Sequence, residues 1–449
     1  MTDCRTTAVG FALLLLLVPA VLCGQSPAAS TWESIGPEGG YLTDIVRNPA
    51  NWDLFAVSYG YPTRLYKSSN GGDTWTNVSQ IDNNIQYLLL DPQSPQTMYA
   101  ASSYLGYGTS LGFYKSTDGG LNWIWKSFPG EALTNYYIQE FYLDRSDPNK
   151  VSFVGYSYKS EGSTTTYRTY LARSTNKGES WTLRHFDNVT TEQFYAYCLE
   201  TDPMDGNTIY VGGYSYLPPG YVYGRVFRTT DNGSSWTNIT GTVVQGYVYD
   251  ILTDMSTPGK VFAISYAGVY RSTDKGTSWT RCSGSAWGGR LLCDPSNPAT
   301  MYAYSQGLYC FRSTDAGVTW TSLTSGLAGG STNELVIHPT LSGTLFMATR
   351  AGFYRSTNSG QTWSASNRGL LAAEVPALRC LPTSPKTLYI SFMYNGLYRT
   401  SNALGKAAPS GLMSVTWEKM PEYSYCEGIK QMQVSPTAGN VIYIQEGAG

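Results

Sequence analysis

The stretch STDGGLNW, from Ser116 to Trp123, recurs with small changes at six other places in the chain. The other copies are SSNGGDTW from Ser68, STNKGESW from Ser174, TTDNGSSW from Thr229, STDKGTSW from Ser272, STDAGVTW from Ser313 and STNSGQTW from Ser356. Their shared pattern is Ser or Thr, any residue, Asp or Asn, any residue, Gly, any residue, usually Ser or Thr, and Trp. Copies spaced about 40 to 60 residues apart are typical of a propeller or a solenoid.

Each position of this box has a structural purpose. The Asp or Asn can accept hydrogen bonds from nearby backbone N–H groups and close a turn, and the Gly can adopt a positive φ. The Trp begins the next strand and covers the hairpin, where full burial would contribute up to about 4 to 6 kcal/mol. We therefore predict a structural role for Asn70, Trp75, Asp118, Trp123, Asn176, Trp181, Asp231, Trp236, Asp274, Trp279, Asp315, Trp320, Asn358 and Trp363.

A second signature precedes the box in most repeats. It reads DPQSPQTMYA from Asp91, DPMDGNTIYV from Asp202, DPSNPATMYA from Asp294, HPTLSGTLFM from His338 and LPTSPKTLYI from Leu381. An apolar strand comes before it, a strand with Tyr or Phe follows, and a third short strand leads into the box. The pattern predicts an all-β fold, a β-propeller of four-stranded antiparallel blades. The Pro-rich turn and the box would then share one face, and the loops between second and third strands would lie on the other.

The number of units is between seven and nine. RTSNALG from Arg399 resembles an eighth, degenerate box, and the ranges 428–434 and 441–444 resemble two strands of a ninth unit. TWESIG from Thr31 resembles an isolated outer strand. Either the terminal strands close the ring imperfectly, or the sequence is part of a longer repeat protein, which we favour. We assign residues 31–449 to the propeller, with an incomplete last unit.

The box pattern resembles the Asp-box, or bacterial neuraminidase repeat (BNR). That repeat occurs in sialidases, xyloglucanase-type glycoside hydrolases, sortilin-type receptor propellers and photosystem II assembly factors. The resemblance extends over nearly all of residues 31–449 and implies a β-propeller. It leaves the function open, because the same fold carries enzymes, receptors and assembly factors.

The N-terminal residues have the pattern of a secretory signal peptide. An apolar run from Val9 to Leu22 follows Arg5, and small or polar residues come after it. This predicts a signal peptide over residues 1–23, cleaved near Cys23, and a secreted, periplasmic or cell-surface location. The alternative is a lipoprotein acylated at Cys23. No later segment is apolar enough to span a bilayer.

The composition argues against several classes of function. A net charge of -2, with 14% charged residues, gives no basis for a nucleic-acid partner. Six cysteines lie beyond the signal peptide without CxxC spacing, and the chain has only two histidines, His185 and His338. We therefore predict no metal site and no cofactor. The one alternative left open is a calcium site formed by loop aspartates, because oxygen ligands leave a diffuse trace in a sequence. Disulfides and buried thiols both remain compatible with the cysteines.

Long tyrosine-rich segments follow the second strand in the second, third and fourth units. They read SSYLGYGTSLG, YSYKSEGSTTTYRT and YSYLPPGYVYGR. A tyrosine ring offers a flat apolar face and a polar tip, which suits binding to sugars or extended peptides. Ligand contact and mutual packing of the rings are both open interpretations. The candidate ligand-binding residues are Tyr104, Tyr107, Tyr156, Tyr158, Tyr214, Tyr216, Tyr221 and Tyr223, together with Trp287 in the segment SGSAWGGR.

No catalytic pair stands out in the sequence. Glycoside hydrolysis normally needs two carboxylates at a defined separation. GPEGGYLTDIV from Gly36 resembles the start of xyloglucanase-type enzymes, which place a catalytic Asp in the loop after the second strand; here that loop, SYGYPTR from Ser58, has no carboxylate. The segment around Arg47 fits the arginine motif of sialidases poorly. Acids that could still act are Glu131, Glu140, Asp187, Glu192 and Glu374.

The leading hypothesis is therefore an exported, non-catalytic propeller. It would bind a polysaccharide or an extracellular protein through the tyrosine-rich segments opposite the boxes. One alternative is a glycoside hydrolase of the same repeat class, xyloglucanase-like or sialidase-like. Another is a scaffold for protein assembly or a receptor.

Overall fold

The computed structural model describes most of the chain beyond residue 38. It covers residues 39–446 except 108–111, 129, 131–133, 145, 162–163, 187–192, 218–220, 243, 255, 285, 306–308, 324–331, 339–340, 342, 368–370, 373–376, 382–383, 393–395, 402–416, 421–428 and 435–441. Every regular element in the described residues is a β-strand.

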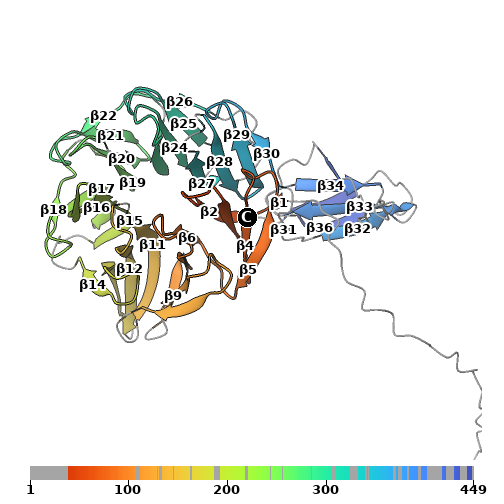
Figure 1. Cartoon of the computed structure of the whole chain (residues 1–449), viewed down its shortest axis with the longest axis horizontal. Coiled ribbons are helices and arrows are strands. Elements are labelled where there is room, and N and C mark those ends of the chain that lie inside the picture. The colour runs from red at the N-terminus through yellow and green to blue at the C-terminus, as the bar shows by residue number, and fades with distance from the viewer. Residues whose placement is uncertain are drawn as a thin grey trace, which may run out of the picture. The chain divides into compact units, whose positions relative to one another are not determined.

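Seven four-stranded antiparallel blades form a ring, each with its first strand nearest the centre (Figure 1). The first three blades are β2 (Leu42–Arg47), β3 (Leu54–Ser58), β4 (Thr63–Ser68) and β5 (Thr76–Ile81); β6 (Tyr87–Leu90), β7 (Met98–Ala101), β9 (Gly112–Ser116) and β10 (Ile124–Ser127); and β11 (Thr134–Leu143), β12 (Val151–Glu161), β13 (Thr164–Ser174) and β14 (Thr182–His185). Strand β8 (Tyr104–Tyr107) adds to the edge of β11 as a fifth strand of blade 3.

The other four blades repeat the same order. They are β15 (Gln193–Asp202), β16 (Asp205–Leu217), β17 (Tyr221–Thr229) and β18 (Thr237–Asn238); β19 (Val248–Thr253), β20 (Val261–Ser265), β21 (Gly268–Ser272) and β22 (Thr280–Arg281); β23 (Arg290–Cys293), β24 (Met301–Ser305), β25 (Tyr309–Ser313) and β26 (Thr321–Ser322); and β27 (Thr332–Ile337), β28 (Leu345–Thr349), β29 (Gly352–Ser356) and β30 (Ser364–Ala365). The predicted class, a propeller of four-stranded antiparallel blades, is confirmed.

The ring closes between blade 1 and blade 7. Leu42 and Ile45 of blade 1 share a hydrophobic cluster with Phe346 of blade 7. The side-chain amide of Asn333 on β27 donates a hydrogen bond of 2.5 Å to the carbonyl of Leu42 on β2. Among the described residues, the ring is thus closed by the packing of the first unit against the seventh. The segment TWESIG lies outside the described residues.

Further strands follow blade 7. Strand β1 (Gly39–Gly40) pairs in parallel with β31 (Leu371–Ala372). An eighth four-stranded sheet consists of β32 (Ala377–Leu381), β33 (Ser384–Phe392), β34 (Gly396–Thr400) and β35 (Glu418–Lys419). The last antiparallel pair is β36 (Ile429–Val434) and β37 (Ile442–Glu446). The strands expected for an eighth and a ninth unit are thus present, and they are additional to the seven-bladed ring.

All seven boxes adopt the same local structure. In the second, the Ser116 hydroxyl donates to the Asp118 carboxylate (2.8 Å) and accepts from the Gly120 N–H (2.9 Å). The same carboxylate accepts from the N–H of Asn122 (2.9 Å). The box glycines have φ between +81° and +87°, which glycine adopts without steric cost. The N–H of the fourth box residue bonds to the turn between the first two strands, as in Lys275 to Gly259 (2.8 Å), so boxes and these turns share one face.

The box tryptophans pack between neighbouring blades. The Trp75 ring lies 5.0 Å from the ring of Phe353 in blade 7, and its indole N–H donates to the carbonyl of Ser366 (3.3 Å). A Cβ added to Gly72 would lie 2.2 Å from the Phe353 ring. The glycine is therefore needed for its φ and for the close approach of the preceding blade, and the Trp joins blades as well as covering its own hairpin.

Replacing Asp231 with alanine is expected to lower the melting temperature by a few degrees, because its carboxylate accepts bonds from both the N–H and the hydroxyl of Ser235 (2.8 and 2.6 Å). Asp231→Asn is the matched control, since three natural boxes carry Asn at this position and form the equivalent backbone bond. Thermal unfolding measures both variants. Equal losses in the two would show that the negative charge, and not the turn geometry, is what matters.

Candidate ligand-binding site

A cavity of 650 Å³ lies at the centre of the ring, where the inner strands of the blades meet. Every blade contributes to it, through its inner strand or the loop beside that strand. The lining residues are Tyr41, Thr43, Gln86, Tyr87, Gln139, Tyr197, Tyr249, Tyr266, Trp287, Gly288, Gly289, Arg290, Tyr304, Ser305, Thr332 and Asn333. The presence of Tyr266, in the turn between the second and third strands of blade 5, places the cavity on the face opposite the boxes.

Irregular pairing in the inner strands supplies five of these lining residues. The register shifts by one residue in β2, β11, β15, β19 and β27, which is the pattern of a β-bulge. A bulge adds one residue and redirects its side chain. The added residues are Thr43, Gln139, Tyr197, Tyr249 and Asn333, and all five line the cavity. The inner strands therefore present a ring of polar and aromatic side chains that a regular ladder would not.

The residue after each bulge forms a second layer beneath the cavity. It is an acid in four strands, Asp44, Glu140, Asp250 and Glu334, and Cys198 in the fifth. The Asp44 carboxylate accepts the Leu88 N–H (2.7 Å), and the Asp250 carboxylate accepts the Leu291 N–H (2.8 Å), so each joins its blade to the next. The Arg290 guanidinium pairs with Glu140 across the ring and lies 3.6 Å from Asp250.

Burial raises the pKa values of three acids in this layer. It raises the pKa of Asp44 to about 7, against the lowering effect of its backbone hydrogen bonds and of Arg290. It raises the pKa of Glu140 to about 7 against the charge of Arg290, and that of Glu334 to about 8 with a further increase from the charge of Asp44. The second layer thus holds protons near neutral pH instead of a full set of negative charges.

The cavity wall itself is almost uncharged. Arg290, with 31% of its side chain exposed, is the only charged residue among those that line it. The rest of the lining offers aromatic rings, hydroxyls, amides and two glycines. Such a surface can stack on flat or ring-shaped ligands and exchange hydrogen bonds with hydroxyl groups. In the described part of the chain, no group of His, Cys, Asp and Glu is placed to hold a metal ion.

A continuous row of tyrosines extends from the cavity along blades 5, 4 and 3. Adjacent ring centroids are 4.8 to 6.3 Å apart at the contacts that define the row. Its members, in order, are Tyr266, Tyr247, Tyr214, Tyr195, Tyr156, Tyr137 and Tyr104, and Tyr197 and Tyr249 connect the row to the cavity. Stacked and edge-on rings of this kind stabilise one another.

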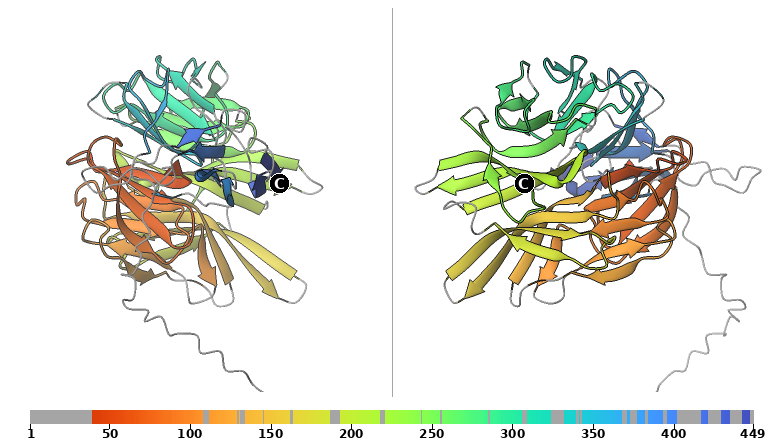
Figure 2. Two further views of the ribbon diagram at one scale, coloured as in Figure 1. Left: turned by 90° about the vertical axis from the view of Figure 1, so that its right-hand side faces the viewer. Right: turned by 60° about the vertical axis from the view of Figure 1, so that its left-hand side comes forward.

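The predicted ligand-binding tyrosines lie on strands and not on loops. Tyr104 and Tyr107 are on β8, Tyr156 and Tyr158 on β12, Tyr214 and Tyr216 on β16, and Tyr221 and Tyr223 on β17. The segments expected to be loops instead continue the second and third strands of blades 3 and 4 as long hairpins, which extend beyond the other strands (Figure 2). Tyr alternates with Ser, Thr or Gly in these segments, which matches the two-residue period of a β-strand. The prediction of loops was wrong because it did not take this alternation into account.

These tyrosines divide into packed and exposed sets. Tyr156, Tyr158 and Tyr214 are half-buried against other rings, whereas Tyr104, Tyr216 and Tyr223 are exposed. The side chains of Tyr107 and Tyr221 lie outside the described residues. Mutual packing of the rings therefore holds for Tyr156, Tyr158 and Tyr214, and also for Tyr104, whose ring lies 4.9 Å from that of Tyr137. Ligand contact by the exposed tyrosines stays a prediction. Trp287 is exposed, lines the cavity, and packs on Tyr309 with 4.7 Å between the ring centroids.

Sequence reasoning missed most of the cavity. Tyr195 and Tyr197, and likewise Tyr247 and Tyr249, belong to inner strands for which the sequence suggested no functional role. The available signal was the pair of tyrosines two residues apart in each strand, followed by a residue that could enter the second layer. Among the acids considered for catalysis, Glu140 lies in the second layer, while Glu131, Asp187, Glu192 and Glu374 lie outside the described residues.

Four cysteines whose side chains the structure describes are free thiols. Cys198 and Cys310 are buried, and Cys282 and Cys293 are half-buried. Burial raises the pKa of the Cys198 thiol well above its usual value, so it is not poised as a nucleophile. Among the described residues, we find no helix that is long and apolar enough to cross a membrane.

Comparison with known proteins finds one curated relative with partial similarity to this chain. No family model matches the chain. A probable oligoxyloglucan-reducing end-specific xyloglucanase from Neosartorya fischeri is 25% identical over 245 residues, which is 50% of this chain and 28% of the relative. The chain thus spans well under half the length of that curated relative.

Solved structures with similar folds include YCF48 proteins and a GH74 enzyme. YCF48 bound to D1 peptide is 14% identical, with a TM-score of 0.43 over 70% of this chain and 90% of the other. An ancestral GH74 enzyme is also 14% identical, with a TM-score of 0.37 over 94% of this chain and 76% of the other. YCF48 from Cyanidioschyzon merolae is 13% identical, with a TM-score of 0.38 over 71% of this chain and 95% of the other.

Proposed function

We propose that this protein is an exported, non-catalytic propeller that binds a polysaccharide across the central cavity and the exposed tyrosines beside it. The observation that carries the proposal is the chemistry of the cavity wall, which combines aromatic rings with neutral hydrogen-bonding groups contributed by all seven blades. Sugar rings present flat C–H faces and many hydroxyls, so they match both parts of this surface. The tyrosine-rich hairpins would extend the contact to several sugar units.

The placement of the acids favours binding over hydrolysis. No Asp or Glu is among the residues that line the cavity. The nearby acids have other partners: Glu140 pairs with Arg290, and Asp44 and Asp250 accept backbone N–H groups of the next blade. Retaining and inverting glycosidases both need two carboxyl groups that flank the scissile bond. Within the described residues, the proposed site therefore contains no catalytic pair.

Affinity electrophoresis of the secreted form against plant, algal and microbial polysaccharides tests this function, with reducing ends assayed in the same samples. We expect retardation by at least one neutral polysaccharide and no new reducing ends. New reducing ends that disappear on mutation of one carboxylate would instead establish a glycoside hydrolase. The similarity to the xyloglucanase makes xyloglucan the first polysaccharide to include.

A protein partner is the second candidate function. The tyrosine row offers an extended aromatic surface, and such a surface also suits an extended peptide. This candidate predicts no retardation by any polysaccharide and co-purification of a defined protein through the hairpins of blades 3 and 4. The same electrophoresis therefore separates the two functions, because only one of them requires a response to sugars.

A further inference from the structure

Two joints between neighbouring blades share one arrangement of charges. The fourth box residue is a lysine in blades 3 and 5, and its ammonium pairs with an Asp of the preceding blade: Lys177 with Asp91 (2.7 Å) and Lys275 with Asp202 (3.8 Å). The carbonyl of the same lysine accepts a bond from a basic side chain of the preceding blade. The donors are Lys115 (2.9 Å) and Arg228 (2.7 Å). A single lysine thus completes each joint.

The joint between blades 3 and 4 departs from this arrangement. Its fourth box residue is Asn232, which has no charge to offer Asp144, the equivalent acid of blade 3. Arg173, the basic residue of blade 3 at this joint, pairs with Asp144 instead. One guanidinium nitrogen, Nη2, donates to Asp144 (3.2 Å) and to the carbonyl of Gly206 (2.9 Å). Asp144 is therefore neutralised without the lysine.

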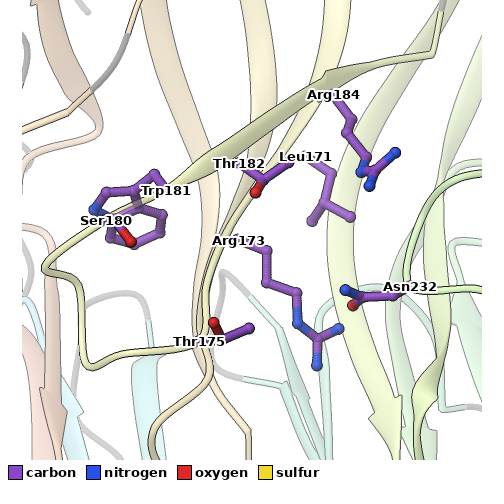
Figure 3. Close-up of a pocket in the computed structure, with 8 residues that line it drawn as sticks. All are labelled: Leu171, Arg173, Thr175, Ser180, Trp181, Thr182, Arg184 and Asn232. Carbon is purple, nitrogen blue, oxygen red and sulfur yellow. The ribbon is translucent and has the colours of Figure 1, made fainter.

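The exchange leaves a small polar cavity of 90 Å³. Figure 3 shows Arg173 on β13 and Arg184 on β14 extending toward Asn232. Arg173 is 95% buried, and its Nε and Nη1 have no hydrogen-bond partner among the described residues. The Oδ1 of Asn232 is equally without one there. Buried polar atoms are nearly always hydrogen-bonded. We therefore expect a molecule in the cavity to form hydrogen bonds with these atoms of Arg173 and Asn232.

The charges around the cavity select an anion. Its lining includes two guanidinium groups, the hydroxyls of Thr175, Ser180 and Thr182, and no carboxylate. Rotation of the Asn232 amide would present its two N–H donors in place of the oxygen, since the two orientations are isosteric. A cavity of 90 Å³ holds about three waters or one tetrahedral oxyanion. An oxyanion satisfies the guanidinium N–H donors better than water does, because its hydrogen bonds with them are charge-assisted.

We propose that the cavity between blades 3 and 4 is a binding site for one tetrahedral oxyanion, sulfate or phosphate. Arg184 supplies a positive charge that is unpaired among the described residues, Arg173 supplies its Nε and Nη1 donors, and the hydroxyls of Thr175, Ser180 and Thr182 supply the rest. The site lies on the box side of the ring and shares no residue with the central cavity. It is therefore independent of the proposed sugar binding. A bound anion would join the blades that carry the long tyrosine hairpins.

Asn232→Lys is the decisive variant, because it restores the lysine found at the other two joints. The backbone accepts this change: φ is +59° at Asn232, and +57° and +59° at Lys177 and Lys275. The new ammonium should reach Asp144 and occupy the space of the anion. We expect the variant to fold and to lose the anion site.

Thermal unfolding with increasing sodium sulfate, at constant ionic strength, measures the binding. Sulfate also stabilises proteins generally by exclusion from their surface, but that effect does not saturate and is common to all variants. We expect a saturable rise of several degrees in the wild type at millimolar sulfate, and only the unsaturated slope in Asn232→Lys. Identical curves for the two proteins would overturn the proposal.

Arg184→Gln provides a second variant that leaves the Arg173–Asp144 pair in place. We expect the sulfate concentration at half-saturation to rise about tenfold, the effect of losing one charge-assisted hydrogen bond. An unchanged half-saturation would contradict the proposal. Parallel titrations with inorganic phosphate and with galactose 6-sulfate distinguish a free ion from a sulfate ester on a sugar. The sugar ring of the ester would have to remain outside the cavity of 90 Å³ while its sulfate group is bound.

Discussion

Replacing both Tyr266 and Trp287 with alanine is expected to weaken polysaccharide binding about 100-fold, because each lost ring removes roughly 1 to 1.5 kcal/mol of stacking energy. Both rings line the central cavity and both are exposed, with 57% and 39% of their surface accessible. Their removal should therefore leave the fold intact. Isothermal titration with the polysaccharide identified by electrophoresis measures the change in affinity.

Trp125→Ala is the matched control for this double variant. Trp125 is an exposed tryptophan with 43% of its surface accessible, but it lies on β10, the outermost strand of blade 2. We expect wild-type affinity after its removal. A double variant that binds as tightly as the wild type would remove the central cavity from the binding site. Loss of binding in Trp125→Ala alone would move the site to the outer edge of the ring.

The melting temperature is expected to fall by on the order of 10 °C between pH 5 and pH 8.5, because the folded state must release protons from its second layer of acids. Burial raises the pKa values of Asp44, Glu140 and Glu334 to about 7, 7 and 8, from ordinary values of 3.8, 4.5 and 4.5. Between these limits the folded protein binds more protons than the unfolded chain. The free energy of unfolding therefore decreases as the pH rises through this range.

The box acids oppose this trend only at lower pH. Hydrogen bonds from the next residues of the box lower the pKa values of Asp118, Asp231, Asp274 and Asp315 to about 2. Their contribution to stability is present above the unfolded pKa and is lost as the pH falls toward 2. Greatest stability is thus expected between about pH 4 and pH 6, which thermal unfolding across a pH series would show.

Glu334→Gln isolates one group of the second layer. Glutamine can keep the hydrogen bond with the Tyr304 hydroxyl but cannot ionise, so stability should rise at pH 8.5 and change little at pH 5. Glu179→Gln is the control, because hydrogen bonds from Lys115 and Lys126 lower the pKa of that exposed acid. The control should leave the slope between pH 5 and pH 8.5 unchanged. A slope that Glu334→Gln does not reduce would show that this acid is ionised in the folded protein.

The long hairpins show how sequence reasoning can place the correct residues in the wrong element. Tyr156, Tyr158, Tyr214 and Tyr216 stood out because they exceed what a four-stranded blade needs. The same alternation of tyrosine with small residues also fits a strand, and hydrogen bonds between the two halves of each insertion decided for the strand. Length and composition alone do not contain that pairing information.

The sequence by itself determined the blade, because each box closes its turn through contacts among residues at most four positions apart, such as Ser116, Asp118 and Asn122. Only the tertiary structure decided the number of blades and the central cavity that we propose as the binding site. Ring closure depends on whether Leu42 packs on the strand of Phe346, some 300 residues away. The cavity depends on five bulges, each defined by the register of two strands, and a register is a property of the pair and not of either sequence.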